Sequence, residues 1–257
     1  MKLSLVMPYY RNPVMLATHY EIWRSEWAPE LKAQVDVVIV DDGSPEPAAD
    51  VPRPAGLPQI RIFRVLEDRL WNQHGARNLG ARQATAPALL MTDMDHVVPG
   101  DTLEWCLRLA GDLEDWRRTV YTFCRFDAPA GRWWNAGDWR SFNETKRDDG
   151  SNKPHVNSFL LQRDLFWDVG GYDEAYCGHY GTDGRFRRRL YAAARGVLIL
   201  DQSLIRVSRD VIPDASTVAP RKEGRVPGFR KTVEREKRAR GELGKIVTLN
   251  FPWERVV

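Results

Sequence analysis

Short apolar segments that each run into polar side chains constrain the fold of this chain more than any other feature of its sequence. The segments are rich in valine, isoleucine and leucine, and they span residues 3–8, 35–40, 60–66 and 88–92. Nearly continuous apolar runs of this length are typical of strands buried on both faces of a parallel sheet. The chain is therefore expected to build its core around such a sheet.

Between these segments the apolar residues follow a helical period. Leu16, Tyr20 and Trp23, for example, are three or four residues apart. Strands that alternate with helices predict βαβ units, so the expected fold class is α/β, with a mostly parallel, Rossmann-like central sheet flanked by helices. Residues 45–58 hold five prolines, and this crossover is expected to be an irregular loop instead of a helix.

Composition and cysteine content limit the class of protein further. The 257 residues are 43% hydrophobic and 28% charged, which is ordinary for a globular chain. No apolar run approaches the roughly 18 residues that a membrane-spanning helix needs. Cys106, Cys124 and Cys177 lack metal-type or disulfide-type spacing, which favours a reducing, cytoplasmic location. The first apolar segment has no small-residue cleavage site, so the mature chain is expected to start at Met1.

Charge is unevenly spread along the chain. Residues 206–257 carry 13 Lys and Arg against 7 Asp and Glu, a net +6, and because the whole chain carries +3, residues 1–205 carry −3. A helix over 229–245 would be charged on nearly every face, so this basic tail either lies on the surface or contacts a partner such as an anionic membrane. The arginines at 185 and 187–189 run around a predicted helix instead of along one face, so a nucleic-acid partner is not expected.

The segment Thr92-Asp93-Met94-Asp95-His96 directly follows the fourth apolar run. Ligands of open α/β sheets bind at the carboxyl ends of the strands. In an extended Asp-x-Asp segment both carboxylates lie on one side, an arrangement suited to a hard divalent cation that also touches phosphate oxygens. A solvated loop is the alternative interpretation, because Asp-x-Asp alone occurs in many chains.

Other segment ends carry polar groups suited to the same ligand. The first run ends in Pro8-Tyr9-Tyr10, and the second is followed by Asp41-Asp42-Gly43-Ser44, which taken alone also suits a plain turn. Residues 72–80, NQHGARNLG, open a predicted helix whose N-terminal amides favour an anion. The glycine patterns of dinucleotide-binding and P-loop proteins are absent from this run.

Taken in order, MPYYRN, VIVDDGS, NQHGARNLGA and TDMDHVVPGD resemble the donor half of the family 2 glycosyltransferases, which have the GT-A nucleotide-diphospho-sugar transferase fold. The resemblance covers about residues 1–115. It implies these donor-binding residues: Pro8, Tyr10, Asp41, Asp42, Arg77 and Asp93. By the same resemblance, Pro8 and Asp41 line the base pocket and Arg77 meets the nucleotide or diphosphate. Asp93 and Asp95 are implied as ligands of Mn²⁺ or Mg²⁺.

The second half resembles the acceptor side of the same superfamily through two motifs, Gly170-Gly171-Tyr172-Asp173-Glu174 and Tyr180-Gly181-Thr182-Asp183. The second motif usually reads Glu-Asp in related enzymes, and its Asp is the catalytic base. Here Thr182 replaces the Glu, while Asp183 remains and is implied as the base. A plain helix N-cap is the alternative role for Asp183, and the two roles are compatible. Asp173 and Glu174 are implied on the acceptor side.

Relatives often supply a metal-binding histidine after this acidic helix, but all five histidines of this chain precede it. Either diphosphate and water complete the metal shell, or His96 or His179 contributes. Arg206 and Arg209 offer positive charge that would neutralise a leaving diphosphate.

Trp133 and Trp134 would form a platform for the apolar face of an acceptor sugar, although large aromatic residues are equally common in cores. Residues 1–115 are expected to form the donor-binding half of one domain, and residues 116–205 its acceptor-binding and catalytic half. Residues 206–257 would add a loop that closes over the donor and then the basic C-terminal tail.

The function expected from these features is that of a metal-dependent, inverting hexosyltransferase. It would move a sugar from a nucleoside diphosphate, expected to be UDP, to a carbohydrate, lipid-linked or other hydroxyl acceptor, in the cytoplasm or at the membrane periphery. The alternative is a non-catalytic sugar- or nucleic-acid-binding protein on the same fold. In that case Thr182 and the missing histidine mark lost chemistry.

Overall fold

The computed structural model describes residues 1–114, 116–131, 139–216 and 226–257, and ten strands of these residues form one sheet. The strands are β1 (Leu3–Tyr9), β2 (Val35–Asp41), β3 (Gln59–Val65), β4 (Ala88–Met91), β5 (His96–Val97), β6 (Thr119–Asp127), β7 (Asn143–Glu144), β8 (Phe159–Gln162), β9 (Gly196–Arg206) and β10 (Trp253–Arg255). The α-helices are α1 (Pro13–Glu26), α2 (Pro29–Lys32), α3 (Gln73–Gln83), α4 (Gly100–Ala110), α5 (Arg163–Asp168), α6 (Gly184–Ala193) and α7 (Phe229–Ala239). Short 3₁₀ turns are η1 (Ala48–Asp50), η3 (Trp139–Ser141) and η4 (Glu174–Tyr176).

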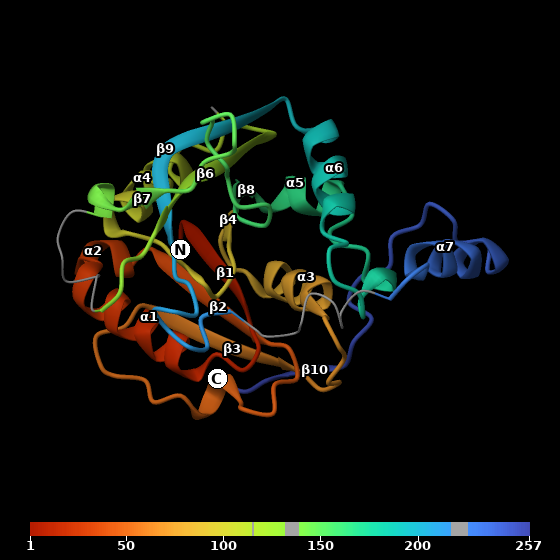
Figure 1. Ribbon diagram of the computed structural model, residues 1–257, viewed down its shortest axis with the longest axis horizontal. Helices are drawn as coiled ribbons and strands as arrows, with labels where there is room; N and C mark the ends of the chain where they lie inside the picture. The colour runs from red at the N-terminus through yellow and green to blue at the C-terminus, as the bar shows by residue number, and fades with distance from the viewer. Residues whose placement is uncertain (115, 132–138, 217–225) are drawn as a thin grey trace.

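The four apolar segments of the sequence form the parallel part of this sheet. β1 pairs in parallel with both β2 and β4, and β2 pairs in parallel with β3. Helix α1 connects β1 to β2, and α3 connects β3 to β4, so the predicted βαβ units are confirmed (Figure 1). The proline-rich connection between β2 and β3 contains only the three-residue turn η1 among its helical elements, as its composition predicts.

Beyond β4 the sheet becomes mixed. Its order is β10-β3-β2-β1-β4-β8-β6-β9-β5, with β7 beside β6. β8 is antiparallel to β4 and β6, and β5 is antiparallel to β9, whereas β6 and β9 run parallel. The prediction of an α/β fold with a mostly parallel central sheet is confirmed.

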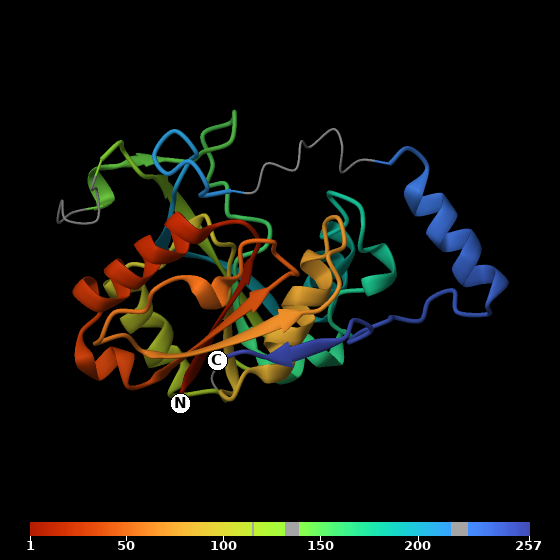
Figure 2. The same cartoon turned by 90° about the horizontal axis from the view of Figure 1, so that it is seen from below.

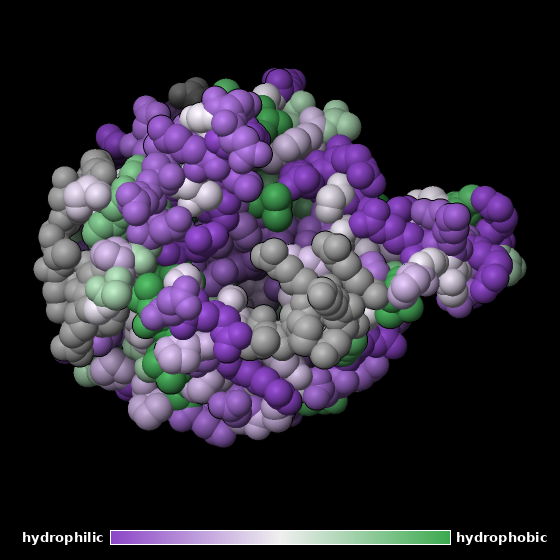
Figure 3. Space-filling model, in the orientation of Figure 1, coloured by the Kyte–Doolittle hydropathy of each residue, from purple (hydrophilic) through white to green (hydrophobic). Residues whose placement is uncertain are grey.

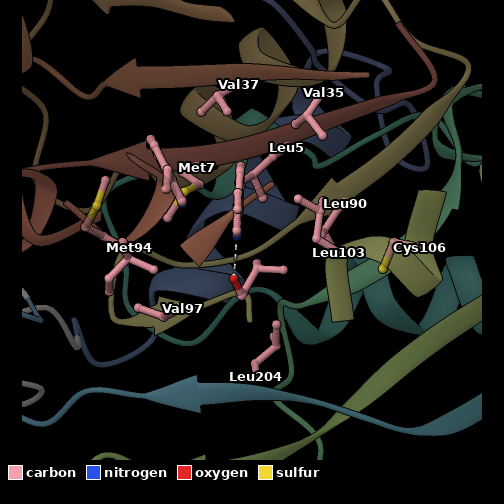
Figure 4. Close-up of a cluster of buried hydrophobic side chains, with 14 of the residues drawn as sticks. Leu5, Met7, Val35, Val37, Leu90, Met94, Val97, Leu103, Cys106 and Leu204 are labelled. Atoms are coloured by element: carbon pink, nitrogen blue, oxygen red, sulfur yellow. Dashed lines mark hydrogen bonds between the residues drawn. The ribbon is translucent and has the colours of Figure 1, made fainter. Parts of the chain in front are cut away.

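Hydrophobic residues on both faces of the sheet are buried. Successive side chains of a strand point to opposite faces of the sheet. Leu5 and Met7 of β1 therefore belong to the cluster that includes α1 and α4, part of which is shown in Figure 4. Val6, between them, packs with α3 on the other face. A Cβ atom on Gly80 of α3 would lie 2.3 Å from Cγ1 of Val6. The close approach of α3 to the sheet therefore requires glycine at this position.

All three cysteines are buried and none forms a disulfide. Within the described ranges, the helices are too short or too polar for any of them to cross a lipid bilayer.

The C-terminal segment is tied to the body of the protein at both ends. After β9, the Asp214 carboxylate accepts hydrogen bonds from the first amides of α1, at 2.7 and 2.9 Å. At the other end, β10 pairs antiparallel with β3 at the sheet edge, with Trp253 opposite Val65 (Figure 2). Between these anchors α7 extends away from the sheet in both views. Residues 206–257 thus include an edge strand as well as a basic arm.

Candidate active site

A cavity of about 290 Å³ opens at the carboxyl ends of β1, β2 and β4. The loops that precede α3, β8 and α6 and the segment after β9 complete its wall. The face seen in Figure 3 is hollowed near its centre, where hydrophilic residues gather. Ala215 and Ser216, from the start of the predicted closing loop, line the cavity, and residues 217–225 of that loop lie outside the described part of the chain.

Most residues expected to bind the donor meet at this cavity. Pro8, Tyr10, Asp42 and Asp93 line it. Arg77 instead lies behind the wall, fully buried, where its guanidinium forms an ion pair with Asp93. Arg77 therefore holds a wall residue in place.

Asp41 and Asp42 have different surroundings although they are adjacent. The Asp41 carboxylate does not reach the cavity wall, because it accepts hydrogen bonds from the amides of Ser44 (2.7 Å) and Ala48 (2.9 Å) in the turn after β2. Asp42 lines the cavity. Burial raises the pKa of Asp42 well above its usual value, although hydrogen bonds with Asn72 act in the opposite direction. The Asp42 carboxyl group is thus placed for contact with a ligand.

Asp93 and Asp95 follow β4, and both line the cavity. Besides its pairing with Arg77, Asp93 lies 3.4 Å from Nε2 of His155. Asp95 Oδ1 lies 2.7 Å from Nδ1 of His96. In the described part of the chain no three His, Cys, Asp or Glu side chains are arranged to hold a metal ion. The two carboxylates supply hard oxygen donors, so a cation here would need further ligands from phosphate or water.

Neither histidine considered from the sequence as a metal ligand lines the cavity. His96 stacks on His155, with ring centroids 4.1 Å apart, and Nδ1 of His179 accepts a hydrogen bond from the amide of Val226 (3.0 Å). His155 does line the cavity, and burial lowers its pKa to about 3. Sequence reasoning missed His155 because a lone histidine in a loop carries no periodic or spacing signal.

Asp183 lines the cavity directly before α6. It occupies the N-cap position, but its backbone is helical (φ −54°, ψ −31°) and its side chain forms no capping hydrogen bond. The capping interpretation is therefore wrong. Burial alone would raise the pKa of Asp183, but interactions with His74 and Arg77 outweigh this effect and lower the pKa to about 2. The carboxylate is charged throughout the physiological pH range.

Asp173 and Glu174 are buried away from the cavity wall. Asp173 forms an ion pair with Lys237 of α7 at 2.6 Å. The Glu174 carboxylate accepts hydrogen bonds from the side chain of Asn78 and from the amides of Leu249 and Asn250, at 2.7–2.8 Å. These two acids join the first half of the chain to its C-terminal segment, which gives them a structural role in place of acceptor contact.

The aromatic groups at the cavity differ from those expected. Trp133 and Trp134 lie outside the described residues. Trp71 and Tyr180 line the cavity and meet edge to face, with centroids 4.6 Å apart. Trp71 has a positive φ of 58°, which is uncommon outside glycine. This pair adjoins Asp183, and no sequence pattern marked it.

Arg206 and Arg209 also make other contacts. Arg206 pairs with Asp127 at 2.7 Å, and Arg209 donates to the carbonyl of Pro213 at 2.9 Å. Neither lines the cavity, whereas Arg69 does. Among the described residues of the cavity wall, Arg69, which also pairs with Glu67 at 3.3 Å, carries a positive charge suited to contact with an anionic ligand.

Several solved structures of glycosyltransferases have a similar fold. The chain resembles S. aureus TarS 1–349 in complex with UDP-GlcNAc (TM-score 0.57, 15% identity, 92% of this chain and 66% of that one). Another structure of TarS 1–349 gives a TM-score of 0.56 at 17% identity, covering 84% of this chain and 63% of that one. Mannosyltransferase PcManGT from Pyrobaculum calidifontis, in complex with GDP-Man and Mn²⁺, gives 0.53 at 14% identity, over 79% of this chain and 56% of that one. In both of these TarS comparisons the match spans less than two thirds of the TarS chain.

At these identities the likeness establishes the fold, which is that of the GT-A glycosyltransferases. The family model described as "Glycosyl transferase family 2" matches residues 4–172, well over half of the sequence. The protein belongs to glycosyl transferase family 2, as its motifs predict. No curated protein matches the sequence.

Proposed function

We propose that this protein is a metal-dependent, inverting glycosyltransferase that moves a hexose from a nucleoside diphosphate to an acceptor hydroxyl. The proposal depends on one observation: Asp183 from the second half and the Asp93 and Asp95 pair from the first half line the same cavity. A single-displacement reaction requires a base for the acceptor and charge stabilisation for the leaving group in one site.

Asp183 is the proposed general base. As the acceptor oxygen forms its bond to the anomeric carbon and the bond to the diphosphate breaks, the carboxylate takes the hydroxyl proton, and the configuration inverts. A carboxylate with a pKa of about 2 is a weak base. Proton transfer would thus follow the attack, when the bound hydroxyl has become acidic.

Asp93 and Asp95 would hold Mn²⁺ or Mg²⁺ together with oxygens of the diphosphate and water. When bound, the cation would neutralise charge that develops on the departing diphosphate. The proposed role of Arg77 is to orient Asp93, because it is buried against that carboxylate. Arg69 is placed to attract the phosphates from the cavity mouth.

UDP is the proposed nucleotide. The Asp42 carboxyl group in the cavity wall would accept an N–H group of the base, and uracil presents one. TarS 1–349 was solved in complex with UDP-GlcNAc and with UDP, whereas PcManGT was solved with GDP-Man. The acceptor would be a carbohydrate, lipid-linked or other hydroxyl compound, and the proposed location is the cytoplasm or the membrane periphery.

A thermal-shift assay tests the metal and the nucleotide. UDP with Mn²⁺ at 100 times the dissociation constant should add about 2.7 kcal/mol, or roughly 5–11 °C in Tm for a chain of this size. Asp95→Asn should lose the part of the shift that depends on Mn²⁺, while Asp112→Asn, on an exposed turn, should keep it. Equal shifts for wild type and Asp95→Asn would rule out the metal assignment. A larger shift with GDP than with UDP would make guanosine diphosphate the assigned nucleotide instead.

Slow hydrolysis of a donor tests for an enzyme. With Mn²⁺ and no acceptor, the protein should release UDP from UDP-GlcNAc or from another UDP-hexose in a small panel. A sugar-binding protein on the same fold would bind these compounds and release none.

A further inference from the structure

His74 joins the two halves of the site. It is the second residue of α3, its side chain is 6% exposed, and its ring stacks on Tyr172 with centroids 5.1 Å apart. Nδ1 lies 3.3 Å from the backbone oxygen of Asp173. Nε2 lies 3.2 Å from Oγ1 of Thr182 and 3.3 Å from Oδ1 of Asp183. A ring from the first half of the chain is thus in direct contact with the proposed base from the second.

The hydrogen-bonding capacity of these groups limits the state of the ring. A carbonyl oxygen can only accept, so Nδ1 carries a proton when it bonds to Asp173. Nε2 faces the Asp183 carboxylate, which also only accepts, and the Thr182 hydroxyl, which can donate or accept. When Thr182 donates to Nε2 the ring is neutral. When Thr182 donates instead to the carbonyl of His179, 3.3 Å away, Nε2 is free to carry a proton toward Asp183.

Asp183 is the acceptor that Nε2 faces. Its Oδ1 atom is buried and lies 3.3 Å from Nε2. A buried, charged oxygen without a donor is costly. A hydrogen bond with the Asn157 side chain also lowers the pKa of Asp183. The Asp183 side chain is 16% exposed and lines the cavity, so part of it stays open to a ligand.

We propose that His74 is a positioning residue: its ring is anchored through Nδ1 to the Asp173 carbonyl, and its Nε2 holds Oδ1 of Asp183, so that the carboxylate is oriented for the acceptor hydroxyl. The inference extends the proposed function, because it assumes that Asp183 is the base. The other ionisable groups around the ring are Tyr172, which stacks on it, the Asp173 carboxylate, which is paired with Lys237, and Arg77, which is paired with Asp93.

The threonine at position 182 contacts the His74 ring through its hydroxyl group. A glutamate there, as the related enzymes have, would put a second carboxylate beside the ring. The threonine hydroxyl carries no charge, so Asp183 is the carboxylate that Nε2 of His74 faces. The low pKa of Asp183 agrees with this contact.

Nitrogen NMR on the full chain labelled with ¹⁵N-histidine tests the contact without any substrate. The His74 signals are assigned from their loss in His74→Gln. In Asp183→Asn the Nε2 signal should move at fixed pH, because Nε2 faces the substituted carboxylate, whereas the Nδ1 signal should stay close to its wild-type position, because Nδ1 faces the Asp173 carbonyl. An Nε2 signal that does not move overturns the proposal.

Kinetics then test positioning. With the UDP-hexose that the protein hydrolyses, His74→Leu should lower kcat at least tenfold with the donor KM within twofold of wild type. His74→Gln, whose amide still donates at the Nε2 position, should recover most of kcat. Gln83→Leu, at the other end of the same helix and outside the cavity wall, is the control.

The outcomes separate the two claims. Wild-type kinetics for His74→Leu, or no recovery of kcat in His74→Gln, overturns the positioning role. If wild type hydrolyses no nucleotide sugar, the proposed function fails, and the NMR shift still decides whether His74 holds Asp183. Circular dichroism and thermal unfolding identify any variant that fails to fold. If a His74 variant does not fold, the NMR comparison of wild type with Asp183→Asn still tests the contact, because both proteins retain His74.

Discussion

At the scale of single residues, the carboxylates of the cavity differ because their neighbours differ. Burial raises the pKa values of Asp42 and Asp95. A hydrogen-bond donor or a cation that enters the cavity would stabilise the charged form of these two carboxylates. Burial alone would raise the pKa of Asp183 as well, but the histidine and arginine near it lower the pKa to about 2. It is charged before any ligand arrives, which suits a group that must accept a proton.

Asp183→Asn should abolish sugar transfer and leave donor binding intact. The amide cannot accept the hydroxyl proton, and loss of a general base typically costs about 10²–10⁴ in rate. Donor affinity should change little, since the base acts on the acceptor. Steady-state kinetics with the hydrolysed UDP-hexose and a UDP titration measure both effects. Turnover within about threefold of wild type would exclude Asp183 as the base.

His19 should make stability depend on pH. Its ring is buried, Nε2 donates to the carbonyl of Met94 (2.7 Å), and burial lowers its pKa to about 4. In the unfolded chain the pKa of a histidine is about 6.5. Between that pH and the folded pKa, the unfolded chain binds more protons than the folded chain. The free energy of unfolding therefore falls as the pH drops below about 6.5. At pH 5 the loss from this residue is about 2 kcal/mol.

Urea unfolding at pH 7.5 and pH 5 measures this contribution. His19→Gln keeps a donor toward Met94 but does not titrate. Its stability should fall by about 2 kcal/mol less than that of wild type between the two pH values. An equal fall in the two proteins would mean that His19 is protonated in the folded state.

At the scale of elements, Glu174 connects α3 to the segment that leads into β10. Its two carboxylate oxygens accept hydrogen bonds from Asn78, Leu249 and Asn250. Glu174→Gln leaves one oxygen and adds a donor that faces backbone amides. Hydrogen bonds to a charged group are worth about 1.5–3 kcal/mol each, so Tm should fall by roughly 4–10 °C.

Glu254→Gln provides the control, because Glu254 is exposed on β10. It should change Tm by less than about 2 °C, as ordinary surface substitutions do. UDP binding by Glu174→Gln below its Tm should remain, because Glu174 does not line the cavity. Selective loss of UDP binding at unchanged Tm would instead place Glu174 in the functional site.

At the scale of the whole molecule, the C-terminal segment combines an anchor and an arm. Truncation after Gly228 would remove β10 together with α7, so it would destabilise the sheet edge as well as remove charge. Lys231, Arg235 and Arg238 of α7 are exposed, on the part of the chain that projects from the body. Substitution within α7 is therefore the cleaner test of a membrane role.

The triple charge reversal Lys231→Glu, Arg235→Glu and Arg238→Glu should weaken binding to anionic phosphatidylserine vesicles by at least 10²-fold. Each basic residue near such a surface contributes about 1 kcal/mol. Binding of wild type should also weaken with salt. A matched reversal of the exposed residues Lys2, Arg82 and Arg108 should have a smaller effect. Equal sedimentation of both variants with vesicles would remove the membrane role from α7.

The sequence by itself determined the features that depend on local pattern. Apolar runs predicted β1 to β4, and five prolines predicted the irregular connection after β2. Motifs at the strand ends identified the family and placed Asp42, Asp93 and Asp95 at one edge, because the carboxyl ends of parallel strands lie together. Such features follow from side-chain alternation and backbone restriction within a few residues.

Tertiary structure alone decided which distant groups meet. His74 and Thr182 are 108 positions apart, and β10 reaches β3 from the far end of the chain. No periodicity in the sequence records these pairings. Asp173 and Glu174 are residue types common in binding sites, but in the folded chain Asp173 pairs with Lys237 and Glu174 accepts hydrogen bonds from backbone amides. A buried carboxylate is stable only beside hydrogen-bond donors, and here these donors come from segments distant in the sequence.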